Sequence, residues 1–539
     1  MERNSWTYNR ALELLFDKCP AIGLMVNSWE EEEVVEEALP ELKLEKAEVL
    51  YFYGLGKGEI YNHSKEWLKE NIQRKIIILE DLPGVIAAFL YEPSAIDLLS
   101  DRQVFLEYFT PTDEAIEAIL HRFKSQRIEV LGLNSKGGLE ELRLKLLRKS
   151  ALSYALHMDR LHGYQPFQNF VENLFLLPHS FYANGLLGKF KNIPAIVCGA
   201  GPSLQKTIDT LRQLDNRALI IAGGSTLAAL SSQGIMPHFG MAIDPNLEEY
   251  RRFKNSFGFE VPLLYSTRVH PGIFQTCNGP FGYMRSGIGG ALELWLEEEL
   301  GLLDPLLGKN LSEETVSVTG ICLALAVEMG CNPVLINGVD LAYTDNLHYA
   351  PGIDGEEAVE FKKIDNEKTA ADQILKRKDR LGNPIYTAVR WVMEAASISH
   401  YAKAHPEVQF INTTLGGLGF EGIESQPIEE VVKPFLPTDL RTRVFETIEN
   451  SPMPQQTELT VHRSIQELQE SLARVIACLR ILAKEQKGSE ALAEMDLKEE
   501  MATLYLFYDI AQVLGTEGFW KNWLELALKY QGCLHFLTK

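Results

Sequence analysis

The chain has 539 residues, too many for one hydrophobic core, so we expect several domains. Apolar residues make up 46% and charged residues 23%, which excludes a disordered chain, and a net charge of −22 excludes a nucleic-acid groove over most of the surface. Seven scattered cysteines without a C-x-x-C pair favour reduced thiols, and no apolar stretch has the length of a membrane span or a secretion signal. We therefore expect a cytoplasmic protein with neither a nucleic-acid nor a membrane partner.

Residues 1–160 have the outline of a Rossmann-like domain. The predicted elements are a strand at Ala47–Tyr53, a glycine turn at Gly54–Glu59, a helix at Ser64–Ile72, a strand at Lys75–Leu79 and helices over 113–158. Glu80 and Asp81 follow the second strand, where an acid holds a ribose in dinucleotide-binding domains. A lone glycine turn is a weak signal, so a structural role is favoured over ligand binding.

Residues 161–432 repeat one pattern, in which a short apolar run ends in a turn of small or polar residues. The runs are Pro194–Cys198, Ala218–Ala222, Phe239–Ile243, Val261–Thr267, Pro333–Asn337 and Val408–Ile411, with helical patterns at Leu204–Leu214, Ile321–Met329 and Tyr386–Ala404. This alternation predicts a doubly wound α/β domain, whose ligands collect at the carboxyl ends of the strands. The highly charged segment 354–380 is interpreted as an insertion or lid over that edge.

The turn after the first of these runs, Gly199–Ser203, predicts an anion site. Gly199 and Gly201 can take positive φ and bring backbone N–H groups to an anion, and the following helix adds its positive N-terminus. Asp244 and Asp340 each follow another strand. They would hold ribose hydroxyls, bind a divalent ion such as Mg²⁺, or cap a helix. Ligand binding is favoured because two strands end in the same way.

The loop Tyr343–Tyr349 carries aromatic rings, hydroxyls, a carboxylate and His348, and it follows a predicted strand end. At the same sheet edge as the glycine turn, such a loop is a candidate acid/base site. The alternative is a loop histidine held by a neighbouring backbone group. The residues alone leave both open.

Residues 433–539 show helical periodicity throughout and predict a C-terminal helical bundle. The expected helices are Ser464–Ala483, Glu490–Leu514 and Trp520–Leu537. Docking of a partner, oligomerisation and structural cover are the alternatives for this region, and the oligomeric state is not predicted. The apolar pattern does not keep a strict heptad, which disfavours a coiled coil.

Several motifs occur together in one order: GAGPSL, GGSTLAAL, MAIDP, SVTG, GVDLAYTDNLHYA and NTTLGG. With them, residues of about 194–425 resemble the catalytic domain of the motility-associated factor (Maf) flagellin glycosyltransferases. That family shares its fold with archaeal 6-hydroxymethylpterin pyrophosphokinases, and the elements are more distantly similar to bacterial CMP-sialic-acid sialyltransferases. The layout of a Rossmann-like, a central and a helical domain fits the Maf group better than the short pterin kinases.

The resemblance implies transfer of a nonulosonic acid of the pseudaminic or legionaminic type from a CMP donor to Ser or Thr of a protein such as flagellin. The nucleotide-binding residues are then expected to be Gly199, Ala200, Gly201, Pro202, Ser203, Gly224, Ser225, Asp244, Thr319, Gly320 and Asp340. His348 corresponds to the general base of the sialyltransferases, and Tyr343 or Tyr349 would hydrogen-bond the departing phosphate. No cofactor is required, with Asp244 and Asp340 as the candidate Mg²⁺ ligands. The helical domain would dock the acceptor protein.

Two departures and two rival functions accompany this interpretation. Leu415 stands where an acid is usual in the family, so a metal or sugar contact at that turn is not expected to carry over. Ala200 stands where the sialyltransferases have asparagine, which removes a side-chain contact to the donor, so the identity of the donor cannot be carried over. The first rival is a pterin pyrophosphokinase using Mg²⁺. The second is a non-catalytic glycosyltransferase-like protein that binds partners through its helical domain.

Overall fold

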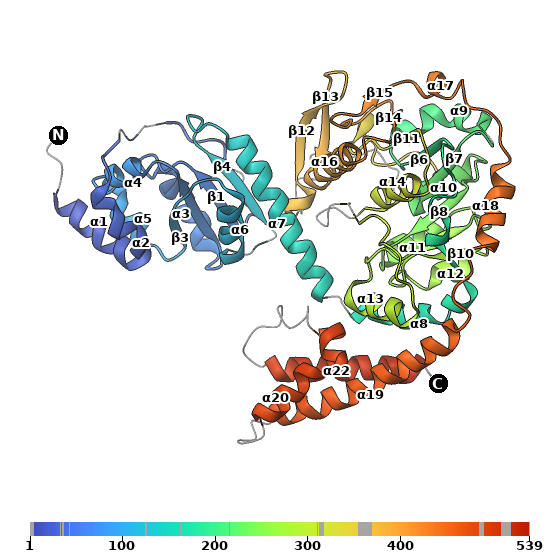
Figure 1. Cartoon of the computed structure of the whole chain (residues 1–539). Helices are drawn as coiled ribbons and strands as arrows, with labels where there is room; N and C mark the ends of the chain where they lie inside the picture. Colours follow the sequence, from blue (N-terminus) through green and yellow to red (C-terminus); the bar gives the residue numbers. More distant parts are fainter. Residues whose placement is uncertain are drawn as a thin grey trace. The chain divides into compact units, whose positions relative to one another are not determined.

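The computed structural model describes residues 5–537 except 33, 35, 36, 43, 124, 126, 162, 163, 215, 310, 312–316, 354–368, 484–489 and 508–518. Two compact units make up the chain (Figure 1). The N-terminal unit comprises Met1–Leu156, Glu360–Leu375 and Ala388–Arg390, and the remainder forms the central unit. Both are α/β, as predicted. Within the described ranges, no helix combines the length and the apolar character needed to cross a bilayer.

The N-terminal unit contains a four-stranded parallel sheet in the order β3-β2-β1-β4. Its strands are β1 (Val49–Tyr53), β2 (Lys75–Glu80), β3 (Val104–Tyr108) and β4 (Ile128–Gly132), and its helices are α1 (Ser5–Lys18), α2 (Pro20–Met25), α3 (Glu59–Glu70), α4 (Pro83–Phe89), α5 (Ser94–Ser100), α6 (Asp113–Arg122) and α7 (Leu139–Leu161). This arrangement confirms the Rossmann-like prediction. The prediction of helices alone over 113–158 is wrong, because β4 lies between α6 and α7. Its alternately buried residues pair with β1.

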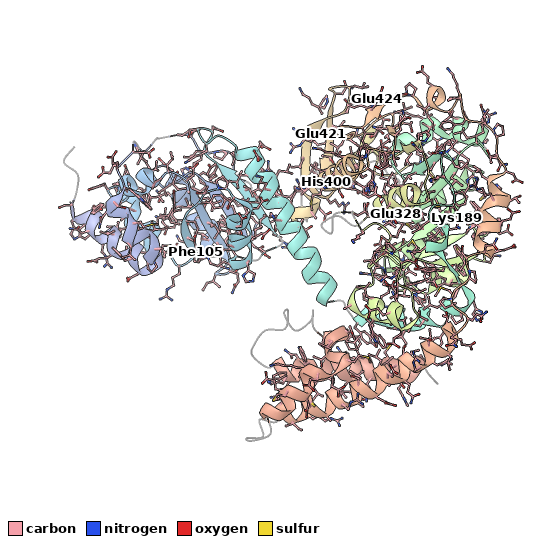
Figure 2. All side chains as sticks on the ribbon, in the orientation of Figure 1. Phe105, Lys189, Glu328, His400, Glu421 and Glu424 are labelled. Carbon is pink, nitrogen blue, oxygen red and sulfur yellow. The ribbon has the colours of Figure 1, made fainter. Side chains whose placement is uncertain are left out.

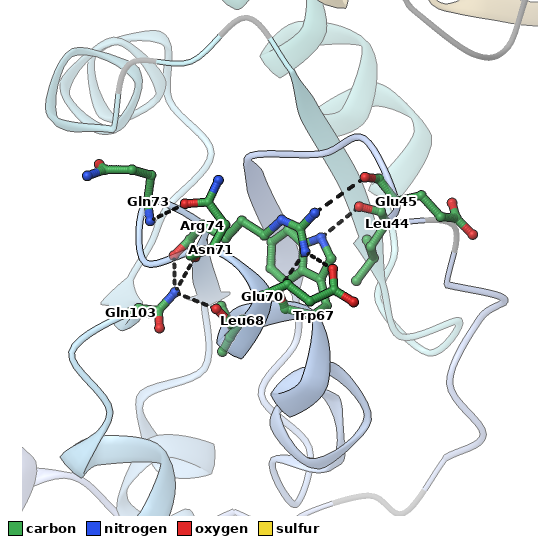
Figure 3. Close-up of polar contacts among 9 residues, drawn as sticks. All are labelled: Leu44, Glu45, Trp67, Leu68, Glu70, Asn71, Gln73, Arg74 and Gln103. Atoms are coloured by element: carbon green, nitrogen blue, oxygen red, sulfur yellow. Dashed lines mark hydrogen bonds and ion pairs between the residues drawn. The ribbon is translucent and has the colours of Figure 1, made fainter.

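Side-chain hydrogen bonds hold the C-terminal end of α3 and the turn that follows it (Figure 3). The Gln103 side-chain amide donates to the carbonyls of Leu68, Asn71 and Arg74, at 3.1, 3.0 and 2.9 Å. The Trp67 indole N–H donates to the carbonyl of Leu44 at 2.7 Å. Carbonyls at a helix end lack partners within the helix, so these contacts fix the connection from α3 to β2.

The central unit is built on a nine-stranded sheet in the order β15-β14-β11-β6-β7-β8-β9-β10-β5, and every pairing that defines its register is parallel. The strands are β5 (Phe181–Tyr182), β6 (Ala195–Cys198), β7 (Leu219–Gly223), β8 (Phe239–Ala242), β9 (Leu263–Tyr265), β10 (Phe281–Tyr283), β11 (Val334–Asn337), β14 (Phe410–Asn412) and β15 (Glu424–Ser425). From β6 to β10 the chain moves in one direction along the sheet, and β11 then returns to the other side of β6. The strand order therefore reverses between β6 and β11.

Helices cover both faces of this sheet, as the doubly wound prediction requires. On one face, Val197, Ile221 and Met241 pack in one apolar cluster with α14 (Val318–Glu328). On the other face, Ile196 and Ile220 pack with α9 (Ile208–Gln213) and α10 (Gly224–Ser232). Neighbouring residues of one strand thus enter different cores. Side-chain hydrogen bonds also tie loops to the helices of this unit. For example, the carboxylate of Glu328, which is labelled in Figure 2, accepts the N–H of Gly308 at 2.8 Å.

Two predicted helices of the central region differ in the structure. The segment predicted as Leu204–Leu214 is a 3-10 turn, η4 (Pro202–Thr207), followed by the short α9. The segment predicted as Tyr386–Ala404 begins as β13 (Pro384–Ala388), which pairs with β12 (Ile374–Lys378), and only then forms α16 (Val389–Ala404). The strand-forming residues Ile, Tyr and Thr open this segment. Of the predicted lid at 354–380, residues 354–368 lie outside the described ranges.

The C-terminal helices share a core with the central sheet. The remaining helices of this unit are α8 (Tyr164–Leu174), α11 (Leu247–Lys254), α12 (Gly272–Thr276), α13 (Gly290–Glu299), α17 (Ile428–Val431), α18 (Leu440–Glu449), α19 (Thr457–Ala483), α20 (Glu490–Glu499) and α22 (Phe519–Leu537). Helix α22 packs on α8 and α19, and α19 on α13 (Figure 1). One apolar cluster contains Tyr265 of β9, Leu472 of α19 and Leu534 of α22. The predicted helices thus form, and they cover the sheet; whether residues 433–539 are a separate domain stays a prediction.

Candidate functional site

A cleft of about 180 Å³ opens at the carboxyl edge of the central sheet, where the strand order reverses. Its walls come from the turns after β6, β7, β8 and β11 and from the first turns of α10 and α14. The lining residues are Cys198, Gly199, Ala200, Gly223, Gly224, Ser225, Thr226, Asp244, Glu249, Arg252, Val318, Thr319, Gly338, Val339, Leu341, Tyr349 and Glu394. A reversal of strand order at this edge is where open α/β sheets bind ligands.

Two helices begin at the cleft. A Cβ at Gly223 would clash with Cγ1 of Val318, so glycine at this position lets the starts of α10 and α14 approach each other. Helix α14 is capped by the Ser317 hydroxyl, which accepts the N–H of Gly320 at 3.0 Å. Helix α10 has no side-chain cap, and its first residues, Gly224–Thr226, line the cleft. The uncapped start of α10 therefore offers N–H donors and a positive dipole end to an anion.

The predicted phosphate cradle at Gly199 and Gly201 has a different structural basis. Neither glycine takes a positive φ, and their N–H groups donate to the carbonyls of Asn337 and Gly338, both at 2.8 Å. A Cβ at Gly199 would lie 2.6 Å from the carbonyl oxygen of Gly338. The expectation that these N–H groups face an anion is thus wrong. The glycines allow the turn after β6 to lie against the turn after β11.

Asp340 joins these two turns. One carboxylate oxygen accepts the hydroxyl and N–H of Ser203 at 2.6 and 3.3 Å, and the other accepts the Thr344 hydroxyl at 2.5 Å. Asp340 is 2% exposed, and burial raises the pKa of its carboxyl against these hydrogen bonds. Ser203 is buried as well, and neither residue lines the cleft. In this conformation the pair holds the loops together, and a role in ligand or Mg²⁺ binding stays a prediction.

Asp244 and Glu249 form a pair of acids in the cleft. The Glu249 carboxylate accepts the N–H of Asp244 at 2.7 Å, and Asn246 caps α11 by accepting the N–H of Glu249 at 2.9 Å. Burial and the neighbouring charge of Asp244 raise the pKa of Glu249 well above its ordinary value. Burial also raises the pKa of Asp244, although Arg268 and Arg252 oppose this. Two adjacent carboxyls of raised pKa can exchange protons with, or hydrogen-bond, a bound hydroxyl.

The loop after β11 places its aromatic rings together beside the cleft. His348 stacks on Tyr349, with ring centroids 3.9 Å apart, and lies 5.2 Å from the Trp391 ring. Tyr343 lies 5.7 Å from His348 and 4.8 Å from Trp391. Tyr349 lines the cleft with the Arg252 guanidinium 5.6 Å over its ring, whereas His348 and Tyr343 are not among the lining residues. The structure thus brings the three predicted catalytic residues together, and only Tyr349 faces the cleft.

The predicted nucleotide-binding residues divide into two groups. Six line the cleft: Gly199, Ala200, Gly224, Ser225, Asp244 and Thr319. Five lie outside its lining: Gly201, Pro202, Ser203, Gly320 and Asp340. Contact of either group with a nucleotide stays a prediction.

Sequence reasoning missed Glu249, Arg252 and Glu394, which line the cleft. A signal existed for Glu249, because Asn246 and an acid three residues later form a capping-box pattern. Arg252 follows Glu249 by three residues and so lies on the same helix face. Glu394 lies in the middle of α16 and had no local signal. Among the described residues, no group of three or more His, Cys, Asp or Glu side chains is arranged to hold a metal ion.

The glycine turn of the N-terminal unit carries a different arrangement. Gly54, Gly56 and Gly58 all take positive φ. The acids that follow β2 are engaged: Glu80 accepts the N–H of Leu55 at 2.8 Å, and the Lys136 ammonium contacts both Glu80 and Asp81. The position predicted for a ribose is therefore filled by an internal ion network, which agrees with the favoured structural role.

Comparison with known proteins locates the resemblance in the central unit. The profile of a family described as 6-hydroxymethylpterin diphosphokinase MptE-like matches residues 168–346, about a third of the chain. The central segment is therefore similar to this family. This span includes β6 to β11 and most of the cleft, so the sequence-based resemblance to the pterin kinases is confirmed for this segment.

The other comparisons add less. The structure of a Maf glycosyltransferase from Magnetospirillum magneticum AMB-1 aligns over 99% of this chain and 96% of that chain, with a TM-score of 0.46 and 14% identity. Similarity at that level transfers neither fold nor activity. No curated protein matches the sequence.

Proposed function

We propose that the protein is a glycosyltransferase that moves a nonulosonic acid from a CMP donor to a Ser or Thr hydroxyl of an acceptor protein such as flagellin. The observation that carries the proposal is the uncapped start of α10, which faces a cleft shared with the acids Asp244 and Glu249. One helix N-terminus suits the single phosphate of a CMP sugar, and carboxyls suit the hydroxyls of its ribose or sugar. The motif set GAGPSL to GVDLAYTDNLHYA supports the same reading.

In this mechanism each residue has a role that follows from where it lies in the site. The start of α10, with Ser225, holds the phosphate and stabilises its charge as the bond between the sugar carbon and the phosphate oxygen breaks. His348 accepts the proton of the acceptor hydroxyl, whose oxygen forms the new bond to the sugar carbon. Tyr349 stacks on His348 and also lines the cleft, so its ring orients the base beside the donor site. We also propose that the C-terminal helices dock the acceptor protein.

The test is His348→Ala, assayed with a CMP-activated nonulosonic acid and purified flagellin. Loss of a general base lowers transfer about 10²- to 10⁴-fold, whereas the stabilisation of the protein by CMP in a thermal-shift assay is retained. The matched control is His400→Ala, an exposed histidine on α16, which leaves transfer unchanged. Normal transfer by His348→Ala would show that His348 is not the base.

A second function is favoured by one observation, the MptE-like match over residues 168–346. In that case the protein transfers diphosphate from ATP to a hydroxymethylpterin. Thermal shift with CMP, compared with ATP plus Mg²⁺, separates the two functions, because a ligand stabilises the protein that binds it. Stabilisation by ATP alone contradicts the glycosyltransferase proposal. Binding of CMP without transfer to any protein supports a non-catalytic binding protein instead.

A further inference from the structure

A second, larger cleft lies at the opposite edge of the central sheet. It measures about 590 Å³, against about 180 Å³ for the cleft at the carboxyl edge. Its walls are the segments that enter β8, β9 and β10, at 236–238, 257–262 and 275–278, together with one face of α18. It is separated from the first cleft by the length of the strands. A volume of this size is typical of sites that enclose a small molecule.

His238 lines this cleft, and one of its ring nitrogens has no hydrogen-bond partner among the described residues. Its Nδ1 accepts the N–H of Ile220 at 3.0 Å, so the proton of the neutral ring is on Nε2. The side chain is 3% exposed, and Nε2 has no hydrogen-bond partner among the described residues. Burial and the charge of Arg441 lower the pKa of His238 to about 3, which keeps the ring neutral at physiological pH. Buried donors are usually paired with protein or water, and a bound acceptor is one partner that would satisfy this one.

The rest of the cleft is apolar at its rim and cationic on one wall. Phe257, Phe259 and Phe445 are 63%, 40% and 43% exposed, which is high for phenylalanine, and all three line the same cleft. Arg441 is held by a hydrogen bond of 2.9 Å to the carbonyl of Met236. Within the described part of the lining the one acid, Glu260, is exposed. Aromatic walls with a few fixed polar groups are the usual composition of a small-molecule site.

We propose that this cleft binds a small molecule with a flat aromatic body and an anionic oxygen acceptor, such as a carboxylate or sulfonate. The acceptor receives the Nε2–H of His238 and faces Arg441, and the aromatic body lies against the exposed phenylalanines. The site is separate from the proposed donor cleft, and its occupation does not depend on which reaction that cleft performs.

Fluorescence titration of the full chain tests the proposal with two related probes. One is 8-anilinonaphthalene-1-sulfonate, and the other is N-phenyl-1-naphthylamine, which has the same aromatic body without the sulfonate. We expect saturable binding of one sulfonate probe per chain, at least tenfold tighter than the neutral probe. His238→Asn keeps an acceptor, its Oδ1, for the N–H of Ile220 and removes the Nε2–H, while its amide N–H groups lie closer to the backbone. We expect this variant to bind the sulfonate probe about tenfold more weakly and to bind the neutral probe with unchanged affinity.

Two exposed phenylalanines provide a matched pair of variants at surface positions. We expect Phe445→Ala, at the rim of the cleft, to weaken the binding of both probes. Phe536 lies on α22 outside the cleft and is 80% exposed, so we expect Phe536→Ala to weaken the binding of neither probe. Circular dichroism of each variant confirms that it is folded. Non-saturable binding, equal binding of both probes, or equal effects of the two phenylalanine variants would overturn the proposal.

Discussion

The two units place a glycine turn at the carboxyl end of a parallel strand and acids after a neighbouring strand, yet the sites differ. In the N-terminal unit the acids are closed off, because Lys136 contacts Glu80 and Asp81. In the central unit the acid pair of Asp244 and Glu249 lines a cleft beside the uncapped start of α10. The same kind of turn therefore supports a packed ion network in one case and an open cleft in the other. What distinguishes them is whether a cation of the protein makes a direct ion pair with the acids, as Lys136 does, or acts on them from farther away, as Arg252 and Arg268 do.

The largest effect is expected from breaking the closed network with Lys136→Met. The lysine side chain is 13% exposed and that of Glu80 is 1% exposed, so the variant leaves a buried charge without its partner. We expect a loss of about 3–5 kcal/mol in the stability of the N-terminal unit. Hydrogen exchange of β1 and β2 in a urea series measures it. Lys145→Met, which removes the exposed pair with Glu141, is the control, and an equal effect of both variants would contradict the closed-network interpretation.

A change of pH is expected to have an intermediate effect on the free energy of unfolding, and this effect has opposite signs in the two units. Hydrogen bonds from Lys136 and Tyr53 outweigh burial and hold the pKa of Asp81 below its ordinary value, so this stabilisation is lost as the pH falls below about 4. The pKa of Glu249 is raised by burial, so its contribution is present below about pH 4 and is lost as the pH rises toward its folded pKa.

Hydrogen exchange of α11 between pH 5 and 8 measures the second effect. Where Glu249 is protonated in the folded chain and ionised in the unfolded one, the free energy of unfolding falls by about 1.4 kcal/mol for each rise of one in pH. Glu249→Gln cannot ionise and is expected to remove the dependence. A slope that persists in this variant would assign the effect to another group.

The sequence predicted the layers of the fold well and the site only in part. Runs such as Ala218–Ala222 are apolar without a break, so strands buried on both faces could be identified. Strands β5 and β10 have two and three residues, too few for a periodic signal. The hydrogen bond between the Ser203 hydroxyl and the Asp340 carboxylate joins residues that are 137 positions apart in the sequence, beyond the reach of any local pattern. No local pattern shows that a carboxylate at a strand end is already paired, which is why Asp340 and Asp244 looked equivalent.

The smallest effect on stability is expected from replacing Lys206, which lies in η4 just after the turn that follows β6. Its ammonium lies 3.2 Å from the Asp345 carboxylate, and the two side chains are 49% and 67% exposed. Water and salt screen such a pair, so Lys206→Met is expected to cost less than about 1 kcal/mol. Thermal unfolding at low and high salt measures it. A cost as large as that of Lys136→Met would mean that the two turns are closed in the same way.

The shared core of the central sheet and the C-terminal helices has a consequence for synthesis on the ribosome. The N-terminal unit draws nearly all of its described residues from the first 156, so it can fold while the rest is being translated. The sheet residue Tyr265 belongs to a core completed by Leu534, close to the end of the chain. The core around Tyr265 is therefore completed only after Leu534 has been translated, and until then part of its apolar surface stays uncovered.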